Sequence, residues 1–280
     1  MTPLNDLRCG LGEGAFWHPE RAAFFWFDIT ARCLHSLART WQFEEVVSAM
    51  GWVDARRVLI ASETRLFLLD LDSGAETTLC ALEAGNPVTR SNDGRADPQG
   101  GFWIGTMGKR AEPGAGSIWR WHRGALRRLF ADIAIPNAIS FPPDGRSACF
   151  TDTATSRVMR VALDAEGWPQ GQPECWLDLS SAGLKPDGAV FDADGVFWVA
   201  QWGAARVAAH GPDGALLRTV EVPARNATCP AFGGAGLCDL YCTTARQGLA
   251  HPGPLDGAVF RAPDIARGQA EHRVILPAGT

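Results

Sequence analysis

The sequence of 280 residues has a single tyrosine, no long apolar run and little excess charge. Its 26 basic and 31 acidic residues leave a net charge of −5, so no basic face favours a nucleic-acid partner. No segment approaches the roughly 20 apolar residues of a membrane helix, and the start lacks the pattern of a secretory signal. The 46% of hydrophobic residues excludes a disordered chain. We expect a cytoplasmic protein that binds neither nucleic acid nor membranes.

Several sequence motifs of known chemistry are also absent. There is no G-x-S-x-G for a serine hydrolase, no H-E-x-x-H for a zinc protease and no C-x-x-C. The eight cysteines are therefore expected to be buried free thiols rather than zinc ligands. The six histidines show no metal-binding spacing, and we expect them at the surface or in turns.

Tryptophan, phenylalanine, glycine and proline are plentiful, which favours short strands joined by tight turns. A segment with a polar turn followed by an alternating apolar run occurs six times, at intervals of about 33 to 48 residues. The six copies cover residues 19–29, 53–63, 97–107, 142–153, 192–203 and 232–245. A second strand often follows each copy.

Strand-rich repeats of 40 to 50 residues are typical of propeller blades. We predict an all-β fold: a six-bladed β-propeller with four-stranded antiparallel blades, spanning residues 1–280 as a single domain. Because too few residues precede the first copy for a full blade, strands from both termini should close one blade. The sequence does not indicate the oligomeric state.

Four polar motifs precede the turns of the blades: 11–17 (LGEGAFW), 89–100 (TRSNDGRADPQG), 136–145 (PNAISFPPDG) and 185–195 (KPDGAVFDADG). Their equivalent positions should bring Glu13, Asn92, Asn137 and Asp187 to one mouth of the channel. Carboxylate and amide oxygens suit a hard or borderline divalent cation. Each residue taken alone is also a common turn former. Asp152, at the end of another repeat, is expected to stabilise the propeller rather than to support the site.

The ordered motifs resemble the regucalcin/gluconolactonase family of six-bladed propeller lactonases over about residues 9–260. The resemblance implies that Glu13, Asn137 and Asp187 bind one divalent cation, which could be Ca, Zn, Mg, Mn or Fe(II). It assigns proton transfer to Asp187 and substrate binding to Arg90 and Asn92. Many animal relatives carry a longer acidic loop after the G-T-M motif. Here the corresponding loop, residues 108–117, is shorter and contains two basic residues. The substrate of those relatives therefore cannot be assigned to this chain from the loop.

The resemblance implies metal-dependent hydrolysis of a sugar lactone, such as glucono-, xylono- or arabinolactone, to the sugar acid. The alternative is a non-catalytic propeller that binds calcium or another ligand in a regulatory role. Two further points stay open. Either Asp187 or an activated hydroxide is the working base, and Arg90 either binds substrate or only braces its loop.

Overall fold

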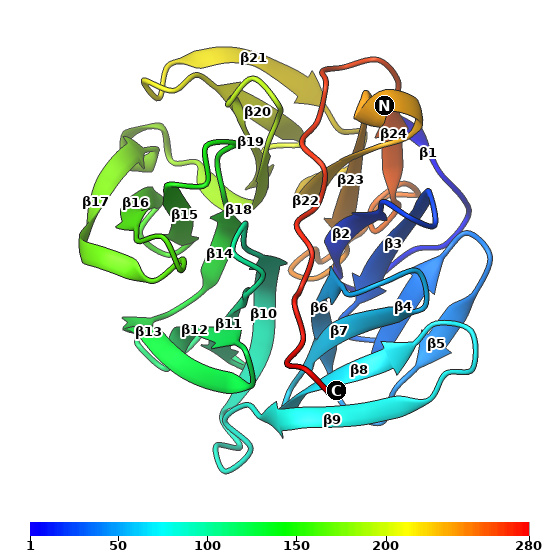
Figure 1. The fold of residues 1–280 in the computed structure, drawn as a ribbon. Helices are drawn as coiled ribbons and strands as arrows, with labels where there is room; N and C mark the ends of the chain where they lie inside the picture. The colour runs from blue at the N-terminus through cyan, green and yellow to red at the C-terminus, as the bar shows by residue number, and fades with distance from the viewer. Residues whose placement is uncertain (280) are drawn as a thin grey trace.

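Residues 1–279 of the computed structural model form six four-stranded antiparallel sheets around a central axis (Figure 1). The predicted six-bladed β-propeller is confirmed. Only two short 3-10 helices occur in this range, η1 (Ser180–Ala182) and η2 (Ala235–Leu237). No helix among these residues has the length and apolar character needed to cross a membrane.

Strands at equivalent positions of the blades share their environment. The innermost strands, next to the axis, are β2 (Gly12–His18), β6 (Val47–Trp52), β10 (Thr89–Ala96), β14 (Pro136–Ser140), β18 (Lys185–Phe191) and β22 (Asn226–Gly233). The second strands are β3 (Ala23–Asp28), β7 (Arg57–Ser62), β11 (Phe102–Gly108), β15 (Ser147–Asp152), β19 (Phe197–Trp202) and β23 (Asp239–Ala245). The third strands are β4 (Cys33–Ser36), β8 (Arg65–Asp70), β12 (Gly116–His122), β16 (Arg157–Leu163), β20 (Arg206–His210) and β24 (Phe260–Ala262). The outer strands are β5 (Thr40–Gln42), β9 (Glu76–Ala81), β13 (Ala125–Ile133), β17 (Pro169–Asp178), β21 (Leu216–Glu221) and β1 (Thr2–Pro3).

The six repeats found in the sequence each contain the second strand of a blade. Aspartates explain the turns that open two of them. The Asp97 carboxylate accepts hydrogen bonds from the backbone N–H of Gly101 and from Trp103 Nε1, at 2.8 and 3.1 Å. Asp192 accepts a matching bond from Trp198 Nε1 at 2.9 Å. The repeat therefore fixes both the turn and the tryptophan that follows it.

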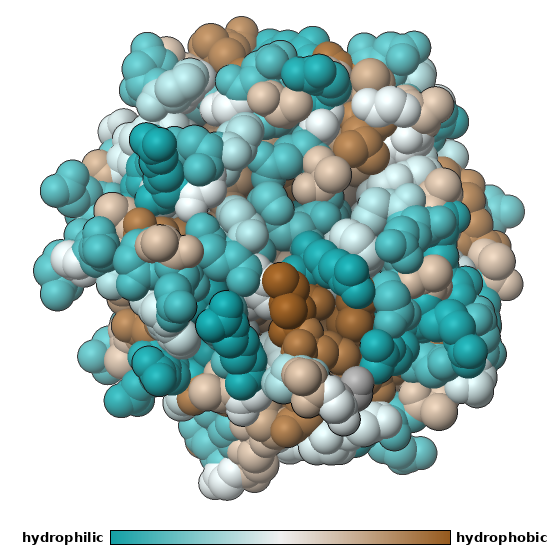
Figure 2. Space-filling model, in the orientation of Figure 1, coloured by the Kyte–Doolittle hydropathy of each residue, from teal (hydrophilic) through white to brown (hydrophobic). Residues whose placement is uncertain are grey.

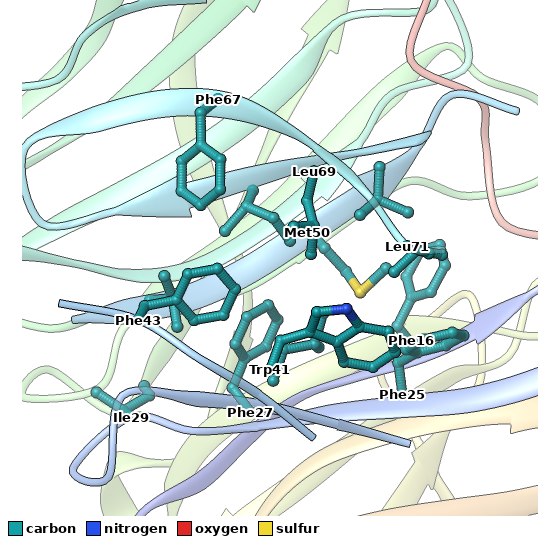
Figure 3. Packing of buried hydrophobic residues seen from close by; sticks show 14 of the residues in the cluster. Phe16, Phe25, Phe27, Ile29, Trp41, Phe43, Met50, Phe67, Leu69 and Leu71 are labelled. Carbon is teal, nitrogen blue, oxygen red and sulfur yellow. The ribbon is translucent and has the colours of Figure 1, made fainter. Parts of the chain in front are cut away.

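Apolar side chains of neighbouring blades pack between the sheets. In the interface of the first two blades, Phe16 and Phe25 belong to one cluster with Met50 and Phe67, and all four are fully or almost fully buried (Figure 3). Each such side chain stabilises the fold by about 1.5–3 kcal/mol relative to an exposed one. Outer strands are exposed by comparison, as β21 shows.

Both termini contribute to one blade. In β1, Thr2 and Pro3 pair with Arg261 and Phe260 of β24, whose neighbours are β23 and β22. The predicted closure by strands from both ends of the chain is confirmed. Pairing the N-terminal strand with β24 completes this blade from both ends of the chain and so holds the ring closed.

The segment after β24, residues 263–279, crosses the middle of the ring (Figure 1), and we call it the C-terminal strap. Trp52 Nε1 donates to the Glu271 carbonyl at 2.8 Å, and Ile275 N donates to the Gly100 carbonyl at 2.9 Å. These partners lie where the inner strands stop, so the strap covers that end of the channel. This face is mostly polar, with an apolar area close to the end of the chain (Figure 2).

Two expectations on single residue types need correction. Four histidines, His18, His35, His122 and His210, are buried in strands rather than exposed or in turns. His18 shows why, since its ring packs near Phe16, Phe25 and Trp52 between sheets. All eight cysteines are free thiols, as expected, but Cys175 is exposed and Cys80 and Cys238 are only half-buried.

Candidate active site

A cavity of about 350 Å³ opens at the end of the channel opposite the strap, where the inner strands begin. Its lining includes all five residues singled out in the sequence: Glu13, Arg90, Asn92, Asn137 and Asp187. They come from β2, β10, β14 and β18, which belong to four different blades. The structure therefore brings the five side chains together, while their chemical roles stay predictions.

Each inner strand has a shift in its pairing register with the second strand of its blade. In β10 the shift lies between Ser91 and Gly94, and in β18 between Pro186 and Ala189. Asn92 and Asp187 thus lie inside irregular pairing. Such β-bulges are frequent beside active sites because they redirect a side chain out of the regular alternation.

In β2 and β14 the redirection is visible in the backbone. Gly14, directly after Glu13, has φ +55°, and Ala138, directly after Asn137, has φ 55°. A Cβ at position 14 would lie 2.6 Å from the Ser48 carbonyl oxygen, so only glycine fits there. Ala138 is a non-glycine residue in the left-handed region, a conformation that concentrates at functional sites.

A chain of hydrogen bonds fixes the two amide side chains across three blades. Arg90 Nη1 donates to Asn92 Oδ1 at 2.8 Å, and Asn92 Nδ2 donates to Asn137 Oδ1 at 2.9 Å. Asn137 Nδ2 donates to Thr153 Oγ1 at 2.9 Å, and that hydroxyl donates to the Pro186 carbonyl at 2.7 Å. Because both amide NH₂ groups are engaged, the orientation of each amide oxygen is set by its partners.

Arg90 braces its strand and also lines the cavity. Its Nη1 braces the strand by donating to the Ser91 carbonyl at 2.8 Å as well as to Asn92. Burial lowers the pKa of Arg90 to about 10, against the opposing charges of Glu13 and other carboxylates. The guanidinium therefore stays protonated at neutral pH. Its remaining donors are available on the cavity wall.

The Glu13 and Asp187 carboxyls of the cavity are neighbours and affect each other's protonation. Burial raises the pKa of Glu13 to about 8, and the charge of Asp93 adds to this rise. Burial, followed by the charges of Glu13 and Asp93, raises the pKa of Asp187 well above its ordinary value. Two buried carboxylates side by side are costly unless a positive charge joins them.

The donor set fits a divalent cation. Among residues 1–279 no three His, Cys, Asp or Glu side chains form a metal cluster. Here the third donor is an amide: Asn137 Oδ1 has a second lone pair besides the one that accepts from Asn92. Glu13, Asp187 and Asn137 together offer oxygen ligands only, the preference of hard cations.

The sequence did not single out several residues of the cavity wall. Thr153 positions Asn137, while Lys185, Trp202 and Gln247 also line the cavity. Asp152, in contrast, accepts hydrogen bonds from backbone N–H groups, including that of Ile135 at 3.0 Å. The expected structural role of Asp152 agrees with these bonds. Its neighbour Thr153 is the residue that contacts the site.

The family model described as SMP-30/Gluconolactonase/LRE-like region matches residues 11–246 of this chain. The chain belongs to this family. The resemblance inferred from the motifs is thereby confirmed, and the matched region contains all five residues singled out in the sequence.

Relatives of known name cover nearly the whole chain. The L-arabinolactonase of Azospirillum brasilense is 36% identical over 97% of this chain and 94% of its own. The 6-deoxy-6-sulfogluconolactonase of Pseudomonas putida is 32% identical over 89% of this chain and 90% of its own. A solved structure described as a calcium-binding protein, regucalcin, from Agrobacterium tumefaciens str. C58 has a TM-score of 0.95 and 38% identity. It covers 98% of this chain and 97% of its own.

Proposed function

We propose that this protein hydrolyses the ring ester of a sugar lactone to the sugar acid, with a divalent cation held by Glu13, Asn137 and Asp187. The observation that carries the proposal is the convergence of two carboxyls, two oriented amides and an arginine on one cavity. Membership of the family and the lactonase relatives support a hydrolase that acts on lactones. Gluconolactone, xylonolactone and arabinolactone are the substrates to test first.

In this proposal Arg90 and Asn92 bind and orient the substrate. The free donors of Arg90 can hold ring hydroxyls or the carbonyl oxygen, and its bond to Asn92 keeps the guanidinium in place. Such positioning can lower the barrier by roughly 7 kcal/mol in well-fitted cases. When bound, a divalent cation supplies Lewis acidity, which stabilises negative charge on the carbonyl oxygen and makes water easier to deprotonate.

In this proposal Asp187 transfers the proton. A carboxylate oxygen of Asp187 takes a proton from the attacking water and returns it to the ring oxygen as the ester bond breaks. General acid–base catalysis of this kind contributes about 10²- to 10⁴-fold in rate. Burial of Asp187 excludes bulk water, which strengthens its interactions with the reacting groups.

The test is a panel of aldonolactones assayed with metal-stripped protein and with Ca, Zn, Mg, Mn or Fe(II) added back. We expect little hydrolysis without metal and recovery with at least one cation. Full activity of the stripped protein would contradict the metal role but leave lactone hydrolysis standing. Absence of hydrolysis across the panel with every cation would contradict the proposed function.

Arg90→Ala tests the substrate role separately. We expect a lower kcat/KM, mainly through a higher KM, with unchanged metal content. If Arg90 only braces the strand, the variant loses thermal stability and keeps kcat/KM within about twofold, a difference of roughly 0.4 kcal/mol.

A second candidate is a non-catalytic regulatory propeller that binds calcium. The similarity to the structure described as a calcium-binding regucalcin favours it. Calcium binding at Glu13 and Asp187 without hydrolysis of any lactone would support this candidate over the enzyme.

A further inference from the structure

One charged residue of the cavity has no part in the reaction proposed above. Lys185 begins β18, two residues before Asp187, and is half-buried on the cavity wall. The chain contains 24 arginines but only two lysines. The other one, Lys109, is outside the cavity lining and forms an ion pair with Glu63.

The Lys185 ammonium has neutral partners only. Its Nζ donates to Ser156 Oγ at 3.1 Å and to the Ala154 carbonyl at 3.4 Å. Within the described range no carboxylate lies at ion-pair distance from it. An ammonium has three donors, and these two bonds engage only two of them. The third donor of Lys185 therefore lacks a protein partner.

The charges of the cavity leave this ammonium available to a ligand. Glu13 and Asp187 face each other and would share the cation, and Arg90 is tied to Asn92. With a divalent cation in place, its two positive charges balance the two carboxylates. The charges of Lys185 and Arg90 then remain as an excess of positive charge in the cavity lining. An anionic group on the substrate would balance that excess, whereas a hydroxyl would not.

The position of Lys185 separates it from the reacting end of the site. Two residues along a strand correspond to about 7 Å, so its Cα lies well away from that of Asp187. Trp202 is directly opposite Lys185 on β19, and its half-exposed indole lines the same cavity. Opposite residues of antiparallel strands present their side chains on the same face. An apolar ring surface and a cation thus lie side by side.

We propose that Lys185 and Trp202 form a subsite for an anionic substituent on the exocyclic end of a sugar lactone, so that the preferred substrates are anionic aldonolactones. This inference rests on the proposed lactonase function. The sulfonate, the phosphate and the carboxylate share the required chemistry, an oxygen anion on the exocyclic carbon. A relative is named for a lactone of this kind, 6-deoxy-6-sulfogluconolactone.

The kinetic test compares gluconolactone with its 6-sulfo, 6-phospho and 6-carboxylate counterparts. For the wild type we expect kcat/KM at least tenfold higher for one or more of the anionic lactones. Lys185→Met keeps the length of the side chain without its charge, and it should lower the anionic-to-neutral ratio about tenfold through KM. Lys185→Arg should retain part of the preference. Lys109→Met, the matched control, should leave the ratio unchanged.

A second readout needs no turnover. Reductive methylation with ¹³C-formaldehyde gives NMR signals for the two lysines and the N-terminus, and Lys109→Met identifies the signal of Lys109 and, by elimination, that of Lys185. Titration with 6-deoxy-6-sulfogluconate, the product of the sulfo-lactone, should shift the Lys185 signal and leave that of Lys109 in place.

The outcomes separate this inference from the function on which it rests. If lactones are hydrolysed and Lys185→Met changes kcat/KM equally for neutral and anionic substrates, the subsite is contradicted. The lactonase function is not affected by that result. Absence of hydrolysis with every lactone contradicts the lactonase, and the NMR titration then still decides anion binding at Lys185. A Lys185 signal that does not shift contradicts the subsite whether or not the Met variant folds.

Discussion

At the strap end of the central channel a buried carboxylate faces a guanidinium, whereas at the cavity end two carboxyls face each other. Glu271 of the strap pairs with Arg95 of β10, with side chains only 9% and 11% exposed. At the other end Glu13 and Asp187 lie together, and the nearby Arg90 is engaged with Asn92. Both ends bury ionisable side chains, but only the strap end pairs opposite charges with each other.

The two ends therefore differ in whether a ligand from outside the protein could add to its stability. A paired charge at the strap end holds the chain end across the ring and needs nothing from outside. At the cavity end, burial of two neighbouring carboxyls destabilises the metal-free protein, and the proposed cation would relieve that cost. Perturbed acids in a cavity are therefore a stronger sign of function than the buried ion pair of the strap.

The largest expected effect is that of Asp187→Asn on catalysis. The change removes the proposed base and one anionic ligand, so kcat/KM for the best lactone should fall by about 10²- to 10⁴-fold. Since one of two adjacent carboxyls is gone, the metal-free variant should be at least as stable as the wild type. Steady-state kinetics and melting temperature check both halves. Loss of activity together with marked destabilisation would mean that Asp187 is a structural residue.

Glu271→Gln should have the opposite profile, with a large loss of stability and little loss of activity. It leaves the Arg95 guanidinium buried without its carboxylate, which costs about 3–5 kcal/mol in comparable cases. Asp194→Asn is the matched control, because the Asp194–Arg267 pair also ties the strap but is 77% and 69% exposed. That control should change the free energy of unfolding by less than about 1 kcal/mol. Equal effects in urea unfolding would show that the Arg95–Glu271 pair adds nothing beyond a surface contact.

The third prediction concerns Asp93, between the two ends. Burial raises the pKa of Asp93 to about 6, although the charge of Arg95 and the Ile139 N–H oppose the rise. A folded-state pKa above the unfolded value of about 3.9 means that the metal-free protein loses stability as pH rises from 4 to 6. The loss is about 3 kcal/mol, because the pKa differs by roughly two units at about 1.4 kcal/mol each, and it is complete about one pH unit above the folded-state pKa.

Asp93→Asn removes this titration and keeps an oxygen to accept the bond from Ile139 N, which is 2.8 Å long in the wild type. The variant should gain stability relative to the wild type at pH 7.5 but not at pH 4. Chemical unfolding of metal-free protein at the two pH values measures the difference. A gain of the same size at both values would rule out protonation of Asp93 as the cause.

The sequence was sufficient for the blades because each one repeats the same turn and strand. In both the Asp97 turn and the Asp192 turn, the aspartate accepts a hydrogen bond from a tryptophan six residues later, so the repeat can be recognised in the sequence. The five residues of the cavity were also predictable, since their motifs occupy equivalent repeat positions and match a known family. What the motifs could not give was the register shifts that redirect Asn92 and Asp187.

Other features had no local sequence signal. Part of the strap's attachment consists of backbone bonds such as that of Ile275 N, and backbone groups are the same for every residue. The burial of His18 depends on Trp52 from the next blade, a contact between distant parts of the chain. Lys185 and Trp202 became neighbours only through the pairing of β18 with β19.

The smallest expected effect concerns the hydrogen bonds that orient the Asn137 amide at the cavity end. Thr153 Oγ1 accepts from Asn137 Nδ2 and donates to the Pro186 carbonyl. Thr153→Val keeps the shape of the side chain and removes both bonds, at about 1 kcal/mol for each. The Asn137 amide is then free to turn its NH₂ group toward the cavity.

Cation affinity should therefore weaken by about five- to tenfold, since 1.4 kcal/mol corresponds to tenfold. Titration calorimetry with Mn or Ca measures the affinity, and kcat at saturating cation should change little. Thr155→Val is the control, because Thr155 lies in the same turn and its hydroxyl donates to the Asp152 carbonyl, away from the cavity. If both variants bind the cation as tightly as the wild type, the orientation of Asn137 is set by its bond with Asn92 and the left-handed turn at Ala138 instead.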